Sequence, residues 1–180
     1  MGQNTLIVYE TYFGSTKQAA IRIGKILAED FNHDVTLHNI GKNQQSPDTE
    51  NYDNIIAGSC IYNGSWACHI DNFLTNNFDG KNIALFVCSM FAGENSLYKK
   101  AYLAYLETPL EKHNHIKPIS MEAFGGRVSQ REYPEQWVMH VANKLPDFTT
   151  DNRTINRVEI WAKELGTILE NKIIAKVPTI

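Results

Sequence analysis

Hydroxyl-bearing side chains surround a single glycine near the start of the chain. The stretch follows an apolar, β-branched run and precedes a helix-like pattern. It consists of Thr11, Tyr12, Phe13, Gly14, Ser15 and Thr16. A turn of this composition offers hydroxyl groups, backbone amides that a glycine leaves accessible, and the positive end of a helix dipole. Because it contains no lysine and no metal-binding carboxylate, it suits a bound phosphomonoester better than a phosphoryl group in transfer. These residues therefore predict a site for a terminal phosphate.

Other motifs that handle phosphate or acyl groups do not occur at the matching positions. The chain has neither the G-x-x-x-x-G-K-[ST] loop of nucleotide triphosphatases nor the dinucleotide fingerprint G-x-G-x-x-G. A receiver domain needs an aspartate at the end of the third strand, where this chain has Gly58, Ser59 and Cys60. Ser59 also lacks the G-x-S-x-G context of a hydrolase nucleophile.

The segment from Ile7 to Thr16 resembles the phosphate loop of flavodoxins, whose pattern after the first strand is Thr-x-x-Gly-x-Thr. The resemblance implies a flavodoxin-like fold and flavin mononucleotide (FMN) as the cofactor. Phe13 departs from the family, which usually has threonine or another small polar residue there.

Two further loops are expected to hold the flavin ring, and both combine aromatic residues with glycine at the carboxyl end of a strand. The loop after the third strand contains Ser59, Cys60, Ile61, Tyr62, Asn63, Gly64 and Trp66. The loop after the fourth contains Ser89, Met90, Phe91, Ala92 and Gly93. Aromatic faces can stack on the ring, and backbone amides can bond its polar edge. Tyr62 and Trp66 are the favoured walls, with Phe91 as a third candidate; the alternative is that these aromatics fill the core.

Within the flavodoxin superfamily, the chain most resembles the branch that contains the menaquinone-dependent protoporphyrinogen oxidase. Residues 51–64, the sequence Phe124-Gly125-Gly126 and the Thr-Asp-x-Arg pattern at 150–153 carry this resemblance. It implies a quinone or a porphyrinogen as the redox partner. The insert of that branch is strongly basic and aromatic, whereas residues 129–148 here carry mixed charges, which argues against a membrane quinone.

Three smaller groups of residues could also bind a substrate or a metal or react. Asp151 is expected to cap the closing helix beside a solvated Arg153, with tethering of the insert or substrate contact as the alternative. His113 and His115 lack the neighbours of a metal site and are expected on the surface. Cys60 and Cys88 are expected to be small apolar fillers. No residue is assigned as catalytic or as a metal ligand.

Alternating short β-rich and longer amphipathic runs predict an α/β fold whose parallel sheet is flanked by helices. Strands are expected at 5–9, 34–40, 54–58, 83–88 and 118–124, and helices at 17–31, 67–78, 97–110 and from about 155 to 169. The family resemblance implies a doubly wound five-stranded sheet of order 2-1-3-4-5. One domain is expected over 1–180, with an insertion at about 126–150 that includes a helix starting near Pro134.

Composition limits the partners. The 17 basic and 20 acidic residues give a formal net charge of −3, which indicates no nucleic-acid partner. Apolar runs are too short to cross a membrane, and three cysteines suggest neither a disulfide framework nor zinc, so a cytoplasmic protein is expected.

These observations favour an FMN-dependent oxidoreductase that acts on a small quinone or porphyrinogen. Two alternatives stay open: an electron carrier that docks on a redox partner protein, and an interaction domain that has lost FMN. The sequence also leaves a homodimer open.

Overall fold

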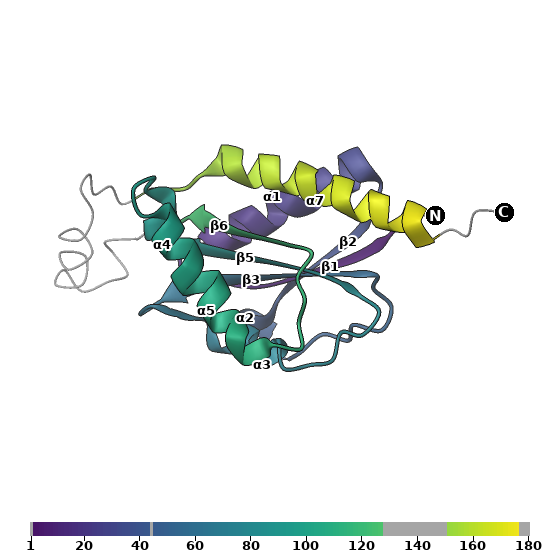
Figure 1. The fold of residues 1–180 in the computed structure, drawn as a ribbon, viewed down its shortest axis with the longest axis horizontal. Coiled ribbons are helices and arrows are strands. Elements are labelled where there is room, and N and C mark those ends of the chain that lie inside the picture. Colours follow the sequence, from purple (N-terminus) through teal and green to yellow (C-terminus); the bar gives the residue numbers. More distant parts are fainter. Residues whose placement is uncertain (1, 44, 128–150, 177–180) are drawn as a thin grey trace.

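The computed structural model describes residues 2–43, 45–127 and 151–176. A parallel sheet with strand order β2-β1-β3-β5-β6 forms its centre, and β4 pairs antiparallel with the end of β3 (Figure 1). The strands are β1 (Asn4–Glu10), β2 (Asp34–Asn39), β3 (Asn54–Tyr62), β4 (Ser65–Trp66), β5 (Asn82–Ser89) and β6 (Ser120–Gly125). The predicted doubly wound sheet is confirmed, because the fourth and fifth strands of the prediction are β5 and β6.

Helices α1 (Ser15–Phe31) and α7 (Ile155–Lys176) cover one face of the sheet (Figure 1). Apolar residues at helical spacing on α1, including Ile23 and Leu27, are fully buried against this face. Trp161 of α7 meets the ring of Phe86 on β5 in the same core, and its indole N–H donates to the Ser120 hydroxyl. The sequence pattern of both helices therefore predicted their buried side, except that Ile155, expected on the buried stripe of α7, is exposed.

Short helices cover the opposite face. They are α2 (Ile40–Asn43), α3 (Cys68–Phe73), η1 (Phe91–Gly93), α4 (Tyr98–Tyr102), η2 (Leu103–Glu107), α5 (Thr108–Leu110) and η3 (Glu111–His113). The helix expected at 97–110 is present from Tyr98, but η2 is a π-helical turn within it. The helix expected at 67–78 is shorter and ends at Phe73. Thr75 and Asn76 end it, because their side chains bond the carbonyl groups of Asn72 and Phe73.

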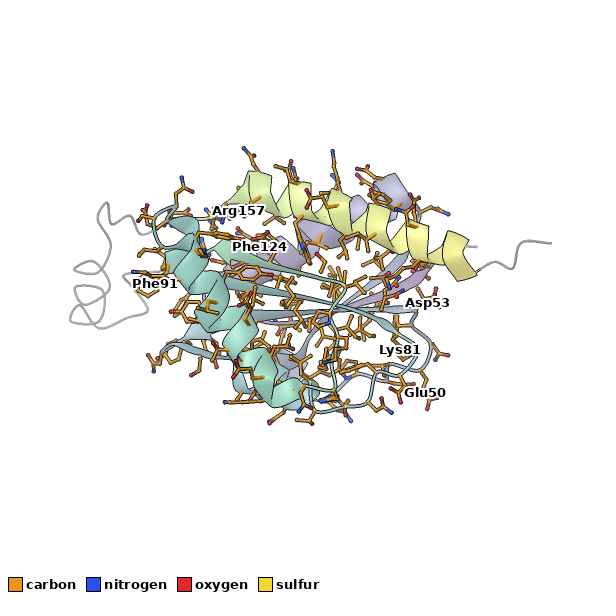
Figure 2. All side chains as sticks on the ribbon, in the orientation of Figure 1. Glu50, Asp53, Lys81, Phe91, Phe124 and Arg157 are labelled. Atoms are coloured by element: carbon orange, nitrogen blue, oxygen red, sulfur yellow. The ribbon has the colours of Figure 1, made fainter. Side chains whose placement is uncertain are left out.

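The amino ends of the strands are held by buried amides. Asn54 of β3 donates to the side chains of Gln3 and Thr5, and Asn82 of β5 donates to Asn54. Figure 2 shows Asp53 and Lys81 at this end of the molecule and Phe91 at the other. These polar contacts fix the strand register at the amino ends. The loops at the carboxyl ends are where parallel sheets usually bind a ligand.

Two expectations from the sequence are wrong, and a third falls mostly outside the described residues. His113 is buried rather than on the surface, because its ring stacks on Trp66 and its Nε2 bonds Asp71. Asp151 does not cap α7, which begins four residues later at Ile155. Most of the insertion expected at about 126–150, with its helix near Pro134, lies outside the described residues. No helix in the described ranges is long and apolar enough to span a membrane.

Candidate functional site

The turn between β1 and α1 has the backbone geometry of an anion-binding loop. Gly14 adopts a left-handed conformation with φ of 83°, which is strained for any residue with a Cβ. Its amide donates to the hydroxyl of Thr11 at 3.0 Å, which closes the turn. The first turn of α1 contains no acidic residue, so its amides and dipole present positive potential to the loop.

Thr16 supplies the most informative side chain of this turn. It is fully buried, and among the residues that the structure describes no nitrogen or oxygen atom hydrogen-bonds its hydroxyl, which interacts with the Cys88 thiol. The Cys88 thiol beside it offers only a weak interaction, and burial raises the pKa of that thiol to about 12. Buried hydroxyls in folded proteins are almost always hydrogen-bonded. The Thr16 hydroxyl lacks a strong partner of this kind, and a bound phosphate oxygen would provide one.

Arg127 brings a cation to the same turn, and the sequence analysis missed it. Its Nε donates to the Phe13 carbonyl at 2.8 Å, and its backbone amide donates to the Ser15 hydroxyl at 3.0 Å. A Cβ on Gly14 would lie 3.2 Å from a terminal guanidinium nitrogen of Arg127. The guanidinium therefore adds positive charge to a loop that appeared neutral in sequence.

Asp151 and Arg153 connect the start of the closing segment to α1. Asp151 forms a β-bridge with Arg127 and an ion pair with Arg153, and Arg153 also bonds the side chain of Gln18. The hydrogen bond from Arg153 is the main reason why the pKa of Asp151 is lowered. The sequence analysis offered tethering of the insert or contact with a substrate as functional roles for this pair. These contacts match the tether, and Arg153 is not simply solvated.

A small hollow of about 40 Å³ lies at the centre of these residues. It is lined by Thr11, Phe13, Ser15, Thr16, Cys60, Ile61, Cys88, Ser89, Met90, Gly126 and Arg127. A water needs roughly 10–15 Å³ by the same measure, so the hollow admits a group of a few heavy atoms. It has the size of a phosphate headgroup rather than of a whole nucleotide.

The loop after β3 is a β-hairpin whose tip lies beside the turn between β1 and α1 (residues 11–16), which we call the phosphate turn. Asn63 and Gly64 have φ of 50° and 80°, as the two central residues of a tight hairpin turn require. Tyr62 meets Tyr12 edge to face, with ring centroids 5.2 Å apart, and both rings are substantially exposed. These two tyrosines therefore offer an aromatic surface to a ligand.

Trp66 is not brought to this cluster. Its indole N–H donates to the carbonyl of Tyr105 at 2.5 Å, and its ring stacks on His113 with an interplanar angle of 4°. These contacts place it in the core between β4 and the helices of that face. They match the core-filling alternative for Trp66.

The loop after β5 is fixed by hydrogen bonds from both sides. Within it, the Ser89 hydroxyl accepts the amide of Ala92 at 3.1 Å. Asn152 donates to the carbonyl of Met90 at 3.1 Å, and a Cβ on Gly93 would collide with its backbone at 2.1 Å. Met90 lines the small hollow, whereas Phe91 lines a separate hollow of about 270 Å³ beside α4. Of the predicted loop, Ser89 and Met90 thus line the hollow at the phosphate turn, whereas Phe91 does not.

Arg157 of α7 braces this loop from the side of the sheet. Its guanidinium donates to the carbonyls of Ala92 and Ala123 and lies 4.4 Å from the centroid of the Tyr98 ring. The Tyr98 hydroxyl donates to Glu122 at 2.6 Å, and burial raises the pKa of that hydroxyl. This network links α7 and α4 to the loop and to β6.

A larger groove of about 490 Å³ lies between α1 and the start of α7. Its floor is apolar and includes Phe124 and Val158, and cationic side chains of Arg22, Lys25 and Arg153 line it as well. The groove adjoins the small hollow, because Ser15 and Cys88 line both. The two cavities together could receive a ligand larger than a phosphate group.

Comparison with protein families gives one match. The model of a family described as "Flavodoxin domain" matches residues 6–147. No curated protein sequence matches the chain.

Solved structures with a similar fold have low sequence identity to the chain. Oxidised flavodoxin 1 from Bacillus cereus is 12% identical, with a TM-score of 0.55 over 89% of this chain and 95% of that one. A short-chain flavodoxin associated with a non-canonical PDU bacterial microcompartment is 14% identical, with a TM-score of 0.56 over 92% and 98%. A flavodoxin from the domain Archaea is 12% identical, with a TM-score of 0.52 over 93% and 99%. At this identity the likeness establishes the fold alone.

Proposed function

The chain belongs to the flavodoxin domain family, and from this premise we propose that it binds FMN and transfers electrons through the bound flavin. The observation that carries the proposal is the buried Thr16 hydroxyl, which among the described residues has only the weak Cys88 thiol as a partner and lines a phosphate-sized hollow at the start of α1. We also propose that the chain falls in the branch around protoporphyrinogen oxidase.

The residues of the turn fit the phosphate of FMN. The hydroxyls of Thr11, Ser15 and Thr16 and the first amides of α1 would hold its oxygens, and Arg127 would offset their charge. Tyr12 and Tyr62 would flank the ring from the hairpin side. When bound, the flavin supplies one- and two-electron chemistry, and the protein supplies binding, orientation and electrostatics.

The two buried thiols near the turn, Cys60 and Cys88, are expected to stay protonated and inert. Burial raises the pKa of both Cys60 and Cys88 to about 12, so neither forms a thiolate at neutral pH. We therefore assign the electron-transfer chemistry to the cofactor and no catalytic step to a cysteine.

We further propose that the electron partner is a small apolar molecule with acid groups rather than a protein. The groove between α1 and α7 supports this choice, because apolar residues line its floor and Arg22, Lys25 and Arg153 stand around it. Each of these cations pairs with an acidic residue of the chain and would meet a ligand carboxylate by sharing or exchanging that partner. A porphyrinogen has this chemistry, in line with the branch suggested by residues 51–64. A carrier function is the alternative, and it predicts that a redox protein oxidises the reduced chain faster than any small acceptor does.

The phosphate anchor can be tested with two flavins that differ by that group alone. We expect the chain to bind FMN, and Thr16→Ala to weaken FMN by about 10–100-fold, because a hydrogen bond to a charged group contributes about 1.5–3 kcal/mol. Riboflavin lacks the phosphate, so its affinity should change little. Fluorescence quenching titrations measure both values, and Thr167→Ala, a change on the exposed side of α7, is the matched control.

Two results would contradict the proposal. Equal losses of FMN and riboflavin in Thr16→Ala would remove the phosphate from this turn. A purified chain that takes up no flavin would favour the interaction domain that has lost FMN.

The partner class is tested in both directions of electron flow under anaerobic conditions. A reduced tetrapyrrole acid is added to the oxidised flavoprotein and followed by the loss of flavin absorbance, whereas a soluble menaquinone analogue and a redox protein are added to the chemically reduced flavoprotein and followed by its return. We expect the small molecules to react faster than the redox protein, and Arg22→Glu to slow the reaction of the tetrapyrrole acid, because that change reverses one charge at the groove.

A further inference from the structure

A glutamate, a cysteine and a histidine converge beside the phosphate turn. Glu10 is the last residue of β1, and Cys68 and His69 are the first two residues of α3. One ligand atom from each lies within 4.8 Å of the others. The three residues come from strand and helix ends that are 58 or 59 positions apart in the chain, so sequence spacing could not reveal them. The function proposed above does not use them.

Local structure explains the convergence. Ala67 has an extended backbone, and its amide donates to the Ser59 hydroxyl at 2.9 Å, which fixes the start of α3 against β3. The amide of His69 in turn donates to Oε2 of Glu10 at 3.1 Å. Glu10 is only 3% exposed, so its carboxylate is held in one place and its Oε1 faces the imidazole.

The distance between Cys68 Sγ and His69 Nδ1 matches a tetrahedral metal ion. Zinc–sulfur bonds of about 2.3 Å and zinc–nitrogen bonds of about 2.0–2.1 Å place sulfur and nitrogen about 3.6 Å apart at a tetrahedral angle. Cys68 Sγ and His69 Nδ1 are 3.6 Å apart. His69 Nδ1 and Glu10 Oε1 are 2.9 Å apart and need to separate by a few tenths of an ångström to reach the roughly 3.3 Å of two zinc ligands.

The surroundings also suit a metal site. A buried carboxylate is costly unless a cation or several hydrogen bonds compensate it, and within the described residues the Glu10 carboxylate bonds only the amide and the ring of His69. The hydrogen bond to Oε2 orients the carboxylate and leaves Oε1 to bind, which is how outer contacts commonly position a metal ligand. Cys68 is exposed and the His69 side chain is 35% exposed, so an ion can enter from solvent.

We propose that Glu10 Oε1, Cys68 Sγ and His69 Nδ1 form a binding site for a divalent metal ion of the zinc type, with solvent in the fourth position. Thiolate and imidazole together select zinc over magnesium or calcium. Binding requires Cys68 to lose its thiol proton to the buffer and the neutral His69 ring to carry its single proton on Nε2, because Nδ1 is the ligand atom. Tyr12 of the phosphate turn lies within electrostatic reach of Glu10 and Cys68, so the ion would add positive charge next to the proposed flavin site.

Zinc chloride titrated into the full chain tests the site by calorimetry. We expect one zinc ion per chain, and at least a tenfold weaker affinity in both Cys68→Ser and His69→Gln. These two side chains are accessible, so their replacement should leave the fold intact, whereas Glu10→Gln changes a buried group and is a secondary variant. His115→Gln, which alters another exposed histidine, should bind zinc like the unmodified chain.

X-ray absorption at the zinc edge supplies a structural readout that flavin does not disturb. We expect one sulfur neighbour at about 2.3 Å in the unmodified chain and none in Cys68→Ser. Absence of stoichiometric binding, or binding that persists in the Cys68→Ser, His69→Gln double variant, would overturn the proposal. Flavin titrations of the same samples keep this result separate from the FMN proposal, because neither site requires the other.

Discussion

Single side chains decide the proposed chemistry, and Thr16 is the clearest case. In the described part of the chain its buried hydroxyl has only the weak Cys88 thiol as a partner. Replacing a poorly satisfied buried hydroxyl with a methyl group of the same shape costs little or even stabilises a fold. We therefore expect Thr16→Val, without flavin, to unfold at the same urea concentration as the unmodified chain or at a higher one. A clear loss of stability would mean that the hydroxyl already has a strong partner, and the argument for a waiting phosphate site would fail.

The tether at Asp151 gives a prediction in pH. Arg153 lowers the pKa of Asp151 in the folded chain, so this carboxylate stabilises the fold above its ordinary pKa of about 4. The contribution is lost as the pH falls through the lower folded value. Thermal unfolding midpoints of the unmodified chain and Asp151→Asn should therefore differ at pH 7 and converge toward pH 2–3. A difference that stays constant over this range would contradict the ion pair.

The sequence could reveal only those site residues that lie close together along the chain. Thr11, Gly14 and Thr16 could be recognised because they lie within one turn. Arg127 and Asn152 could not, because they reach the site from the end of β6 and from the residues before α7. The same limit applies to Glu10 and His69, which are 59 positions apart. Trp66 was a plausible ring wall by its place in the loop, but its partners Tyr105 and His113 come from a later segment.

At the scale of elements, the β1–α1 turn depends on a left-handed glycine. A side chain at such a position costs roughly 1–2 kcal/mol. Gly14→Ala should lose this amount and also bind FMN more weakly, because its Cβ approaches Arg127 to 3.2 Å. Gly80→Ala is the matched control, since Gly80 also has positive φ but has open space around it. Urea unfolding and FMN titration separate the two effects; equal FMN affinity in both variants would deny the turn a role in binding.

Helix and strand periodicity predicted the main elements because each buries a regular face. The strands at 5–9 and 83–88 were predicted within β1 and β5, and both are buried almost throughout. The π-helical turn at Leu103–Glu107 and the early end of α3 were not predicted. Both depend on local hydrogen-bonding choices that apolar spacing does not encode.

The whole molecule links the site to folding through the shared sheet. Both faces of the sheet carry buried cores, and β5 contributes to each of them. We therefore expect one cooperative unfolding transition. Free FMN at about 100 times its dissociation constant should stabilise the fold by about 2.7 kcal/mol, which raises the midpoint by roughly 5–10 °C. Circular dichroism melts measure this shift. Two separate transitions, or an equal shift with the same concentration of riboflavin, would contradict the account.

A crystal structure of the chain with FMN tests the central claim most directly. The account predicts that the phosphate lies in the hollow at the start of α1, that Thr16 donates a hydrogen bond to one of its oxygens, and that the ring lies next to Tyr12 and Tyr62. A structure with the phosphate bound elsewhere, or with this turn empty at saturating FMN, would contradict it.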